Sequence, residues 1–183
     1  TLAEEIWEQA PGCSDLDARA ADFVNADKGV PDVASALLGA GHILAEQLNE
    51  RADLRQKVRK LYRNSGKLTS AKIEDNEKKN KQYRDFLDYT EKLNRVPPHR
   101  VLAINRGEKS KVLRVKVEAD TEAIGKLATE FLIEPDHPHA DFLAGCVRDA
   151  LDRLLLPSLE RETRRELSER AETHAVKVFA KNL

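Results

Sequence analysis

Apolar residues recur at helical spacing through most of this chain, and this spacing limits the folds that the chain can adopt. The last third carries the clearest apolar stripe, formed by Phe142, Leu143, Val147, Leu151, Leu154 and Leu155. Aromatic residues make up only 5% of the sequence and charged residues 34%, which favours charged amphipathic helices over an all-β core. We therefore predict a mostly α fold, an irregular multi-helix array with a small β element and a long C-terminal helix.

Capping and turn residues mark where the helices begin and end. The first helix is expected to stop at Pro11 and Gly12, and a second helix to begin after Ser14 or Asp15. Pro157 is expected to kink or restart the last helix, because proline has no N–H to donate to the preceding turn. The expected helices cover residues 2–10, 15–24, 31–48, 50–63, 83–89, 99–106, 121–132 and 142–183.

The stretch RVPPHRVLAINRGEKSKVLRVKVE, residues 95–118, combines a helix signal with a strand signal. Pro98 suits a first helical turn, so a short helix over 99–106 is expected, with Gly107 in the left-handed position that ends it. Apolar and charged residues then alternate over 113–118, which predicts a half-buried strand. A β-hairpin with 99–105 as its first strand is the alternative. LTSAKI, residues 68–73, is a further candidate strand.

Charge is segregated along the sequence, although the whole chain is nearly neutral. Residues 1–50 carry a net charge of −8, residues 51–116 carry +12, and residues 117–183 carry −5. A basic segment of this kind is typical of a surface that neutralises nucleic-acid phosphates, and also of a segment that folds against acidic flanks. Many of these charges recur at helical surface spacing, which favours the second interpretation.

Three parts are expected along the chain: an N-terminal helical part over 1–66, a basic α/β element over 67–119 and a C-terminal helical part over 120–183. The sequence begins at Thr1 and contains no methionine, so we interpret it as a piece of a longer polypeptide. It has no apolar stretch of membrane length, no signal-peptide pattern and no paired cysteine motif. A reduced, cytoplasmic setting without a membrane partner is therefore expected.

Candidate sites for chemistry are few. His137 and His139 flank a proline, but they lack a third ligand at a recognised spacing, so no metal site is predicted. No phosphate-binding glycine loop or nucleophile motif occurs in the sequence, and no catalytic residue, cofactor or enzymatic activity is expected. The functional surface that the sequence supports is cationic and would contact nucleic-acid backbone or an acidic partner. Its candidate residues are Arg55, Arg59, Lys60, Arg100, Arg106, Lys109, Lys111, Arg114 and Lys116.

Several stretches of the sequence resemble the Tex family of bacterial transcription accessory proteins. They are FVNADKGVPDVASALLGAGHILAEQL (23–48), LRQKVRKLYRNSGKLTSAK (54–72), YRDFLDYTEKLNRVPPHRVLAINRGEKSKVLRVKVEAD (83–120) and the terminal helix from Leu155. The KGVPDV stretch and the P-x-HR-x-LA-x-x-RGE stretch together make the resemblance specific. In order and spacing, these stretches are similar to the helical region that precedes the family's RuvC-like, YqgF-related domain.

The resemblance implies a modular parent protein. Its other parts would include a RuvC-like domain, helix-hairpin-helix elements and a C-terminal OB-type RNA-binding domain. For this chain the resemblance implies a non-catalytic scaffold that orients the nucleic-acid-binding domains of the parent. The implied partners are those domains, RNA or DNA through the parent, and the transcription machinery. The alternative is a direct, non-specific nucleic-acid-binding module that uses the basic 51–116 region.

Overall fold

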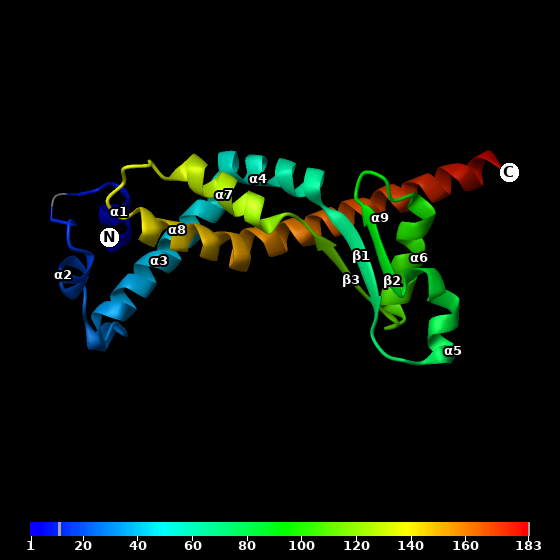
Figure 1. Ribbon diagram of the computed structural model, residues 1–183, viewed down its shortest axis with the longest axis horizontal. Coiled ribbons are helices and arrows are strands. Elements are labelled where there is room, and N and C mark those ends of the chain that lie inside the picture. The colour runs from blue at the N-terminus through cyan, green and yellow to red at the C-terminus, as the bar shows by residue number, and fades with distance from the viewer. Residues whose placement is uncertain (11, 183) are drawn as a thin grey trace. The chain divides into compact units, whose positions relative to one another are not determined.

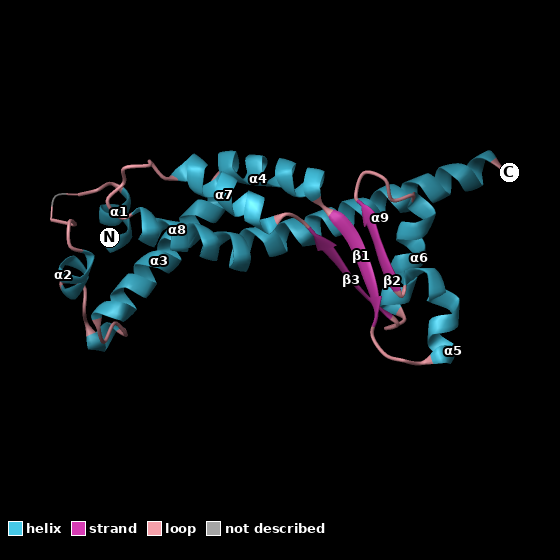
Figure 2. Cartoon of the chain, viewed as in Figure 1, coloured by secondary structure: helices cyan, strands magenta, loops and turns pink. Residues whose placement is uncertain are grey.

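A computed structural model describes residues 1–10 and 12–182 and divides the chain into two compact units. The helical unit comprises residues 1–58 and 122–157, and the sheet unit comprises residues 59–121 and the described residues from 158 on (Figure 1). The predicted mostly α array with a small β element and a long C-terminal helix is confirmed (Figure 2). The expected stop of the first helix at Pro11 lies outside the described residues.

The helical unit packs its helices around α3. Its elements are α1 (Leu2–Trp7), α2 (Leu16–Ala21), a 3-10 turn (Ala26–Lys28), α3 (Val33–Glu50), the first half of α4 (Ala52–Ser65), most of α7 (Thr121–Leu132) and α8 (Ala140–Asp149). Helix α3 contacts α1, α2 and α8, and it buries Leu44 almost completely. The side chains of Asp15 and Asp32 accept hydrogen bonds from the first turns of α2 and α3. The expected Asp15 cap is thus confirmed.

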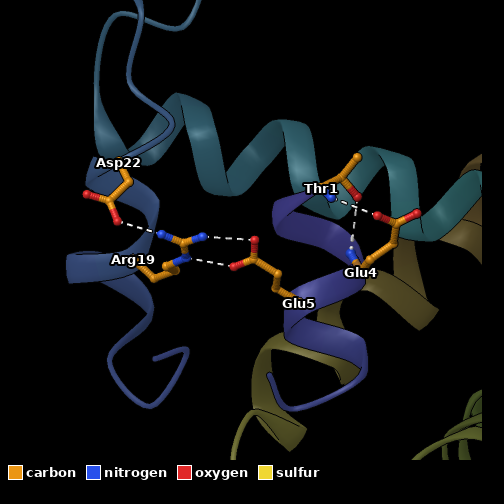
Figure 3. A network of polar contacts seen from close by, with 5 residues as sticks. All are labelled: Thr1, Glu4, Glu5, Arg19 and Asp22. Atoms are coloured by element: carbon orange, nitrogen blue, oxygen red, sulfur yellow. Dashed lines mark hydrogen bonds and ion pairs between the residues drawn. The ribbon is translucent and has the colours of Figure 1, made fainter. Parts of the chain in front are cut away.

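A polar network ties α1 to α2 (Figure 3). Arg19 donates two hydrogen bonds to the Glu5 carboxylate, at 2.6 and 2.9 Å, and a third to Asp22 at 2.6 Å. The hydrogen bond from Arg19 is the main cause that lowers the pKa of Glu5 below its ordinary value. Thr1 and Glu4 form a capping box at the start of α1. Because α1 and α2 are too short to be stable alone, these contacts contribute to their order.

The long C-terminal helix passes Pro157 without a break. Helix α8 runs directly into a π-helical segment, Ala150–Leu155, and then into α9, Leu156–Lys181. In a regular α-helix, a proline ring clashes with the carbonyl group four residues earlier. The π segment widens the helix just before Pro157, so the ring is accommodated at the point where the sequence suggests a kink or a restart. No described helix is long and apolar enough to cross a membrane.

The sheet unit contains three antiparallel strands in the order β2-β1-β3 (Figure 2). Its elements are β1 (Lys67–Lys72), α5 (Glu77–Asn80), a 3-10 segment (Lys81–Phe86), β2 (Asp88–Lys92), α6 (Pro98–Lys109), β3 (Leu113–Glu118), the second half of α4 and most of α9. The predicted strands that became β1 and β3 are confirmed, and the hairpin alternative is wrong because α6 takes its place. One face of the sheet is buried, and Leu68, Ile104 and Leu113 form part of this core.

The expected helix over 83–89 is wrong in its second half. A 3-10 segment ends at Phe86, and β2 begins two residues later. The main-chain N–H of Lys72 donates to the carbonyl of Leu87 at 2.9 Å, and the Ser70 hydroxyl donates to the carbonyl of Phe86 at 2.7 Å. These contacts with β1 draw the segment into the sheet, which is a tertiary effect that local helical spacing does not report.

The prediction that Gly107 ends α6 in a left-handed conformation is also wrong. The helix continues through Gly107 to Lys109, and the left-handed residue is Lys111, with a φ of 58°. A Cβ atom on Gly107 would lie 2.4 Å from Leu113 Cδ1 and 3.1 Å from Tyr83 Cδ1. The close approach of α6 to β3 therefore explains this glycine, and its backbone angle does not.

Candidate nucleic-acid interface

Part of the predicted cationic surface is used inside the sheet unit. Arg59 Nη2 donates a hydrogen bond to Glu162 at 3.2 Å, and Arg59 Nε lies 3.0 Å from the same carboxylate without hydrogen-bonding to it. Arg63, one turn further along α4, pairs with Glu166 at 2.6 Å and with Glu162 at 3.5 Å. Within this unit, the two arginines thus hold the end of α4 against α9.

Side chains from α9 and α4 cover the outer edge of β3. The main-chain N–H of Val117 donates to Glu160 at 3.1 Å, and the carbonyl of Val117 accepts from the Tyr62 hydroxyl at 3.4 Å. Arg164 donates to the carbonyl of Val115 at 3.4 Å. Burial raises the pKa of Tyr62, so its hydroxyl stays protonated and available as a donor. An edge that would otherwise expose unpaired main-chain groups is closed in this way.

Helix α6 is joined to the same helix α9. The carboxylate of Glu108 pairs with Arg164, and the side-chain amide of Asn105 donates to the Ser168 hydroxyl at 2.9 Å. Because Arg164 also reaches the main chain of β3, this one side chain connects α6, β3 and α9. Helix α9 is therefore the element to which α4, α6 and β3 of the sheet unit are fixed by polar contacts.

Arg100 is a second predicted cation that is engaged internally. It pairs with Glu91 of β2 at 3.0 Å, and the Tyr89 hydroxyl donates a hydrogen bond to the same carboxylate. The hydrogen bond from Tyr89 is the main cause that lowers the pKa of Glu91, and Arg100 adds to it. Burial is the main cause that raises the pKa of Tyr89 to about 12. Arg100 therefore has a charged partner already and contributes little free positive charge to the surface.

The opposite face of the sheet is open. Alternate residues of a strand share one face, and the registers of β1 with β2 and β3 place three rows of side chains there. One row is Lys92, Lys67 and Glu118, the next is Thr90, Thr69 and Lys116, and the third is Asp88, Ala71 and Arg114. We call these nine residues the open face. Eight of them are exposed and Thr69 is half-buried.

Four cations lie on the open face: Lys67, Lys92, Arg114 and Lys116. Among the described residues, none of the four forms an ion pair. Lys67 and Lys92 are direct cross-strand partners, and like charges in such a pair are destabilising. Glu118, the partner of Lys67 on β3, offsets part of this repulsion, and a polyanionic ligand would offset the rest. The open face is therefore our candidate nucleic-acid interface.

The remaining predicted cations lie outside the open face. Four of them are exposed, namely Lys60 on α4, Arg106 and Lys109 on α6, and Lys111 in the turn before β3. Arg55 belongs to the helical unit, where it donates hydrogen bonds to Asn49. Of the nine predicted residues, the open face thus holds only Arg114 and Lys116. It adds Lys67 and Lys92, which become neighbours only through the register of β1 with β2.

His137 and His139, for which no metal site is predicted, contact each other inside the protein. His137 Nδ1 accepts a hydrogen bond from the main-chain N–H of His139 at 3.0 Å, and both residues are buried. Their rings contact each other edge to face, 5.9 Å apart, at the entry to α8. In the described part of the chain, no three His, Cys, Asp or Glu side chains are grouped closely enough to hold a metal ion.

Comparison with known proteins matches residues 13–179 to the family described as Tex central region-like. Protein tex of Bordetella pertussis is 36% identical over 196 residues, which cover 100% of this chain and 24% of that protein. Transcriptional accessory protein Tex of Neisseria gonorrhoeae is 31% identical, also over 100% of this chain and 24% of its own length. S1 RNA-binding domain-containing protein 1 of Homo sapiens is 28% identical over 85% of this chain and 17% of its own length. The chain thus spans about a quarter of the length of these bacterial relatives.

Proposed function

Because the chain belongs to the Tex family of transcription accessory proteins, we propose that it is a non-catalytic scaffold region of a longer Tex-like protein. In that role it orients the nucleic-acid-binding domains of the longer protein. RNA is the ligand that we assign to those domains, because the human relative is named for an S1 RNA-binding domain. The transcription machinery is the partner we assign to the whole protein, because a relative is named a transcriptional accessory protein.

One observation carries this proposal: α9 is joined to α4, α6 and β3 by polar contacts within the sheet unit. Arginine and glutamate side chains that could face a ligand instead link one element to the next. A region that positions other domains needs such a fixed internal geometry, because a small misplacement of a binding group lowers its contribution. On this account, part of the segregated charge, namely Arg59 and Arg63 of α4 facing Glu162 and Glu166 of α9, serves to assemble the sheet unit.

A chimera tests the scaffold role. This chain replaces the matching region of the Bordetella pertussis relative, and the binding of a labelled RNA is measured by fluorescence anisotropy. The chimera should bind as tightly as the unaltered relative. A second chimera carries a Gly/Ser linker of the same length in place of the region. Its affinity for the RNA should be lower by roughly 10-fold or more, because domains on a flexible linker no longer engage the RNA together. Unchanged affinity of the linker chimera would argue against a scaffold.

A second function is favoured by the open face, which would contact nucleic-acid backbone directly. The supporting observation is its four cations without an ion-pair partner among the described residues, including the like-charged pair of Lys67 and Lys92. The open face has no aromatic residue to stack on bases, so contacts would be to phosphate and without sequence preference. Such contacts would assist the domains of the longer protein.

The salt dependence of binding tests the open face. A labelled single-stranded oligonucleotide is titrated with the intact chain while salt is raised from about 50 to about 200 mM, and affinity should fall roughly 50-fold for four neutralised phosphates. Replacing the four cations Lys67, Lys92, Arg114 and Lys116 by glutamine should reduce the slope of log affinity against log salt by roughly 3. The matched control replaces Lys126, Arg148, Arg161 and Lys181, which are exposed elsewhere. If both variants reduce this slope equally, the net charge of the chain accounts for the binding and the open face does not.

A further inference from the structure

A groove of about 700 Å³ lies in the sheet unit beside α9. One side is formed by α9, and the other by the end of α4 and the turn after β2, which contribute Asn64 and Asn94. Its lining along α9 runs from Thr163 to Lys177, which is roughly 21 Å of helix at 1.5 Å per residue. We call it the α9 groove. It is separate from the open face, since none of the nine open-face residues lines it.

The charges of the α9 groove are not balanced along its length. Toward one end, Glu166 is neutralised by Arg63 at 2.6 Å. Toward the other end lie Arg170, His174 and Lys177, whose spacing places them on one side of the helix. Arg170 and Lys177 form no ion pair among the described residues. The groove therefore offers uncompensated positive charge over its second half.

The other lining groups suit a peptide better than a nucleic-acid strand. Leu93 and Leu167 contribute an apolar surface to the groove, and the amides of Asn64 and Asn94 can both donate and accept hydrogen bonds, as the main chain of an extended peptide requires. Among the described lining residues there is no Phe, Tyr or Trp ring on which a base could stack, and the imidazole of His174 is the one aromatic ring. A nucleic-acid strand would also carry phosphates past Glu166 and Glu169, whereas a peptide can place neutral residues there.

We propose that the α9 groove binds an extended, acidic peptide segment of a partner protein. Asp or Glu side chains of the peptide lie against Arg170 and Lys177, and an apolar side chain lies over Leu167. A segment of roughly six or seven residues spans the groove at 3.3 Å per residue. This proposal goes beyond the scaffold role and does not depend on it, because the peptide is recognised by the sheet unit itself.

A peptide selection tests this proposal. The intact chain is panned against a display library of random heptapeptides, and the enriched peptides are synthesised with a fluorescein label for anisotropy titrations. The expected result is enrichment of Asp and Glu next to an aliphatic residue, with binding at least 10-fold weaker to the Arg170→Gln/Lys177→Gln variant. The matched control Arg161→Gln/Lys181→Gln changes two exposed cations that do not line the groove and should bind as the unaltered chain does.

Three outcomes would overturn the proposal. The first is that no heptapeptide is enriched, or that the enriched ones lack acidic residues. The second is that the groove variant and the control variant bind the peptides equally well. The third is that a single-stranded oligonucleotide displaces the peptides from the unaltered chain at lower concentration than the unlabelled peptides do, which would assign the groove to nucleic acid. Circular dichroism of both variants, recorded beside the titrations, separates a loss of binding from a loss of folding.

Discussion

The Gly107→Ala variant is expected to unfold with a free energy about 2 kcal/mol lower than that of the unaltered chain, within the usual range for overpacked cores. Alanine is the better helix former by roughly 1 kcal/mol, so helix propensity alone predicts the opposite sign. The added Cβ atom would lie 2.4 Å from Leu113 Cδ1 and 2.8 Å from Leu113 Cγ. Leu113 is only 1% exposed and has little room to move, so steric repulsion should outweigh the gain in propensity.

Three further variants check this cause. Gly125 lies inside α7, and outside its own stretch of helix no described atom lies within 4 Å of an added Cβ, so Gly125→Ala should raise the unfolding free energy by roughly 0.5–1 kcal/mol. Leu113→Ala removes the atoms that the new Cβ would contact. The loss of unfolding free energy in the Gly107→Ala/Leu113→Ala double variant should therefore be about 1 kcal/mol smaller than the sum of the two single losses. Urea denaturation measures the unfolding free energy of these four variants and of the unaltered chain. A stabilising effect of Gly107→Ala would contradict the packing of α6 on β3.

Reversing two charges on α9 is expected to lower the free energy of unfolding about as much as Gly107→Ala does. Glu162→Lys together with Glu166→Lys removes the ion pairs with Arg59 and Arg63 and places like charges beside both arginines. Each of these pairs is partly exposed, so its loss costs at most about 1 kcal/mol, and the repulsion adds a similar amount. We expect the unfolding free energy to fall by about 2 kcal/mol in total. The loss should shrink in about 1 M salt, where charges are screened within about 3 Å.

A charge swap provides the control for the reversed pair. Adding Arg59→Glu and Arg63→Glu to the double variant restores opposite charges across the same contact, so most of the lost stability should return. Reversing Glu122 and Glu130, which are exposed on α7, changes the net charge equally without touching α4 or α9. If this control destabilises the chain as much as the α9 reversal does, the contacts of Arg59 and Arg63 contribute nothing specific to the sheet unit.

Local sequence patterns predict the elements whose residues follow one period throughout. The stretch LRVKVE alternates apolar and charged residues, and it forms β3 with the same alternation of buried and exposed side chains. The helical stripe from Phe142 to Leu155 likewise forms α8 and the π segment after it. In such segments local preference and tertiary packing agree, so the sequence alone is sufficient.

Tertiary contacts decide the features that sequence patterns miss. The DYTEK segment carries no strong strand signal, and it becomes β2 because β1 offers a free edge to pair with. Gly107 resembles a helix end, but Leu113 and Tyr83 pack on it. The direct pairing of Lys67 with Lys92, which are 25 positions apart in the chain, follows from the register of β1 with β2. No local spacing reports such a pair, so half of the cations on the open face could not be found from the sequence.

One titration distinguishes cations that are used inside the protein from cations that are free to bind a ligand. The intact chain is titrated into a labelled single-stranded RNA at about 150 mM salt, where the Debye length is about 8 Å and exposed charges are strongly screened. A scaffold with only auxiliary phosphate contacts should show no saturable binding in the micromolar range under these conditions. Tight binding that persists at this salt concentration and disappears when Lys67, Lys92, Arg114 and Lys116 are replaced by glutamine would contradict the scaffold account and make the chain a binding module in its own right.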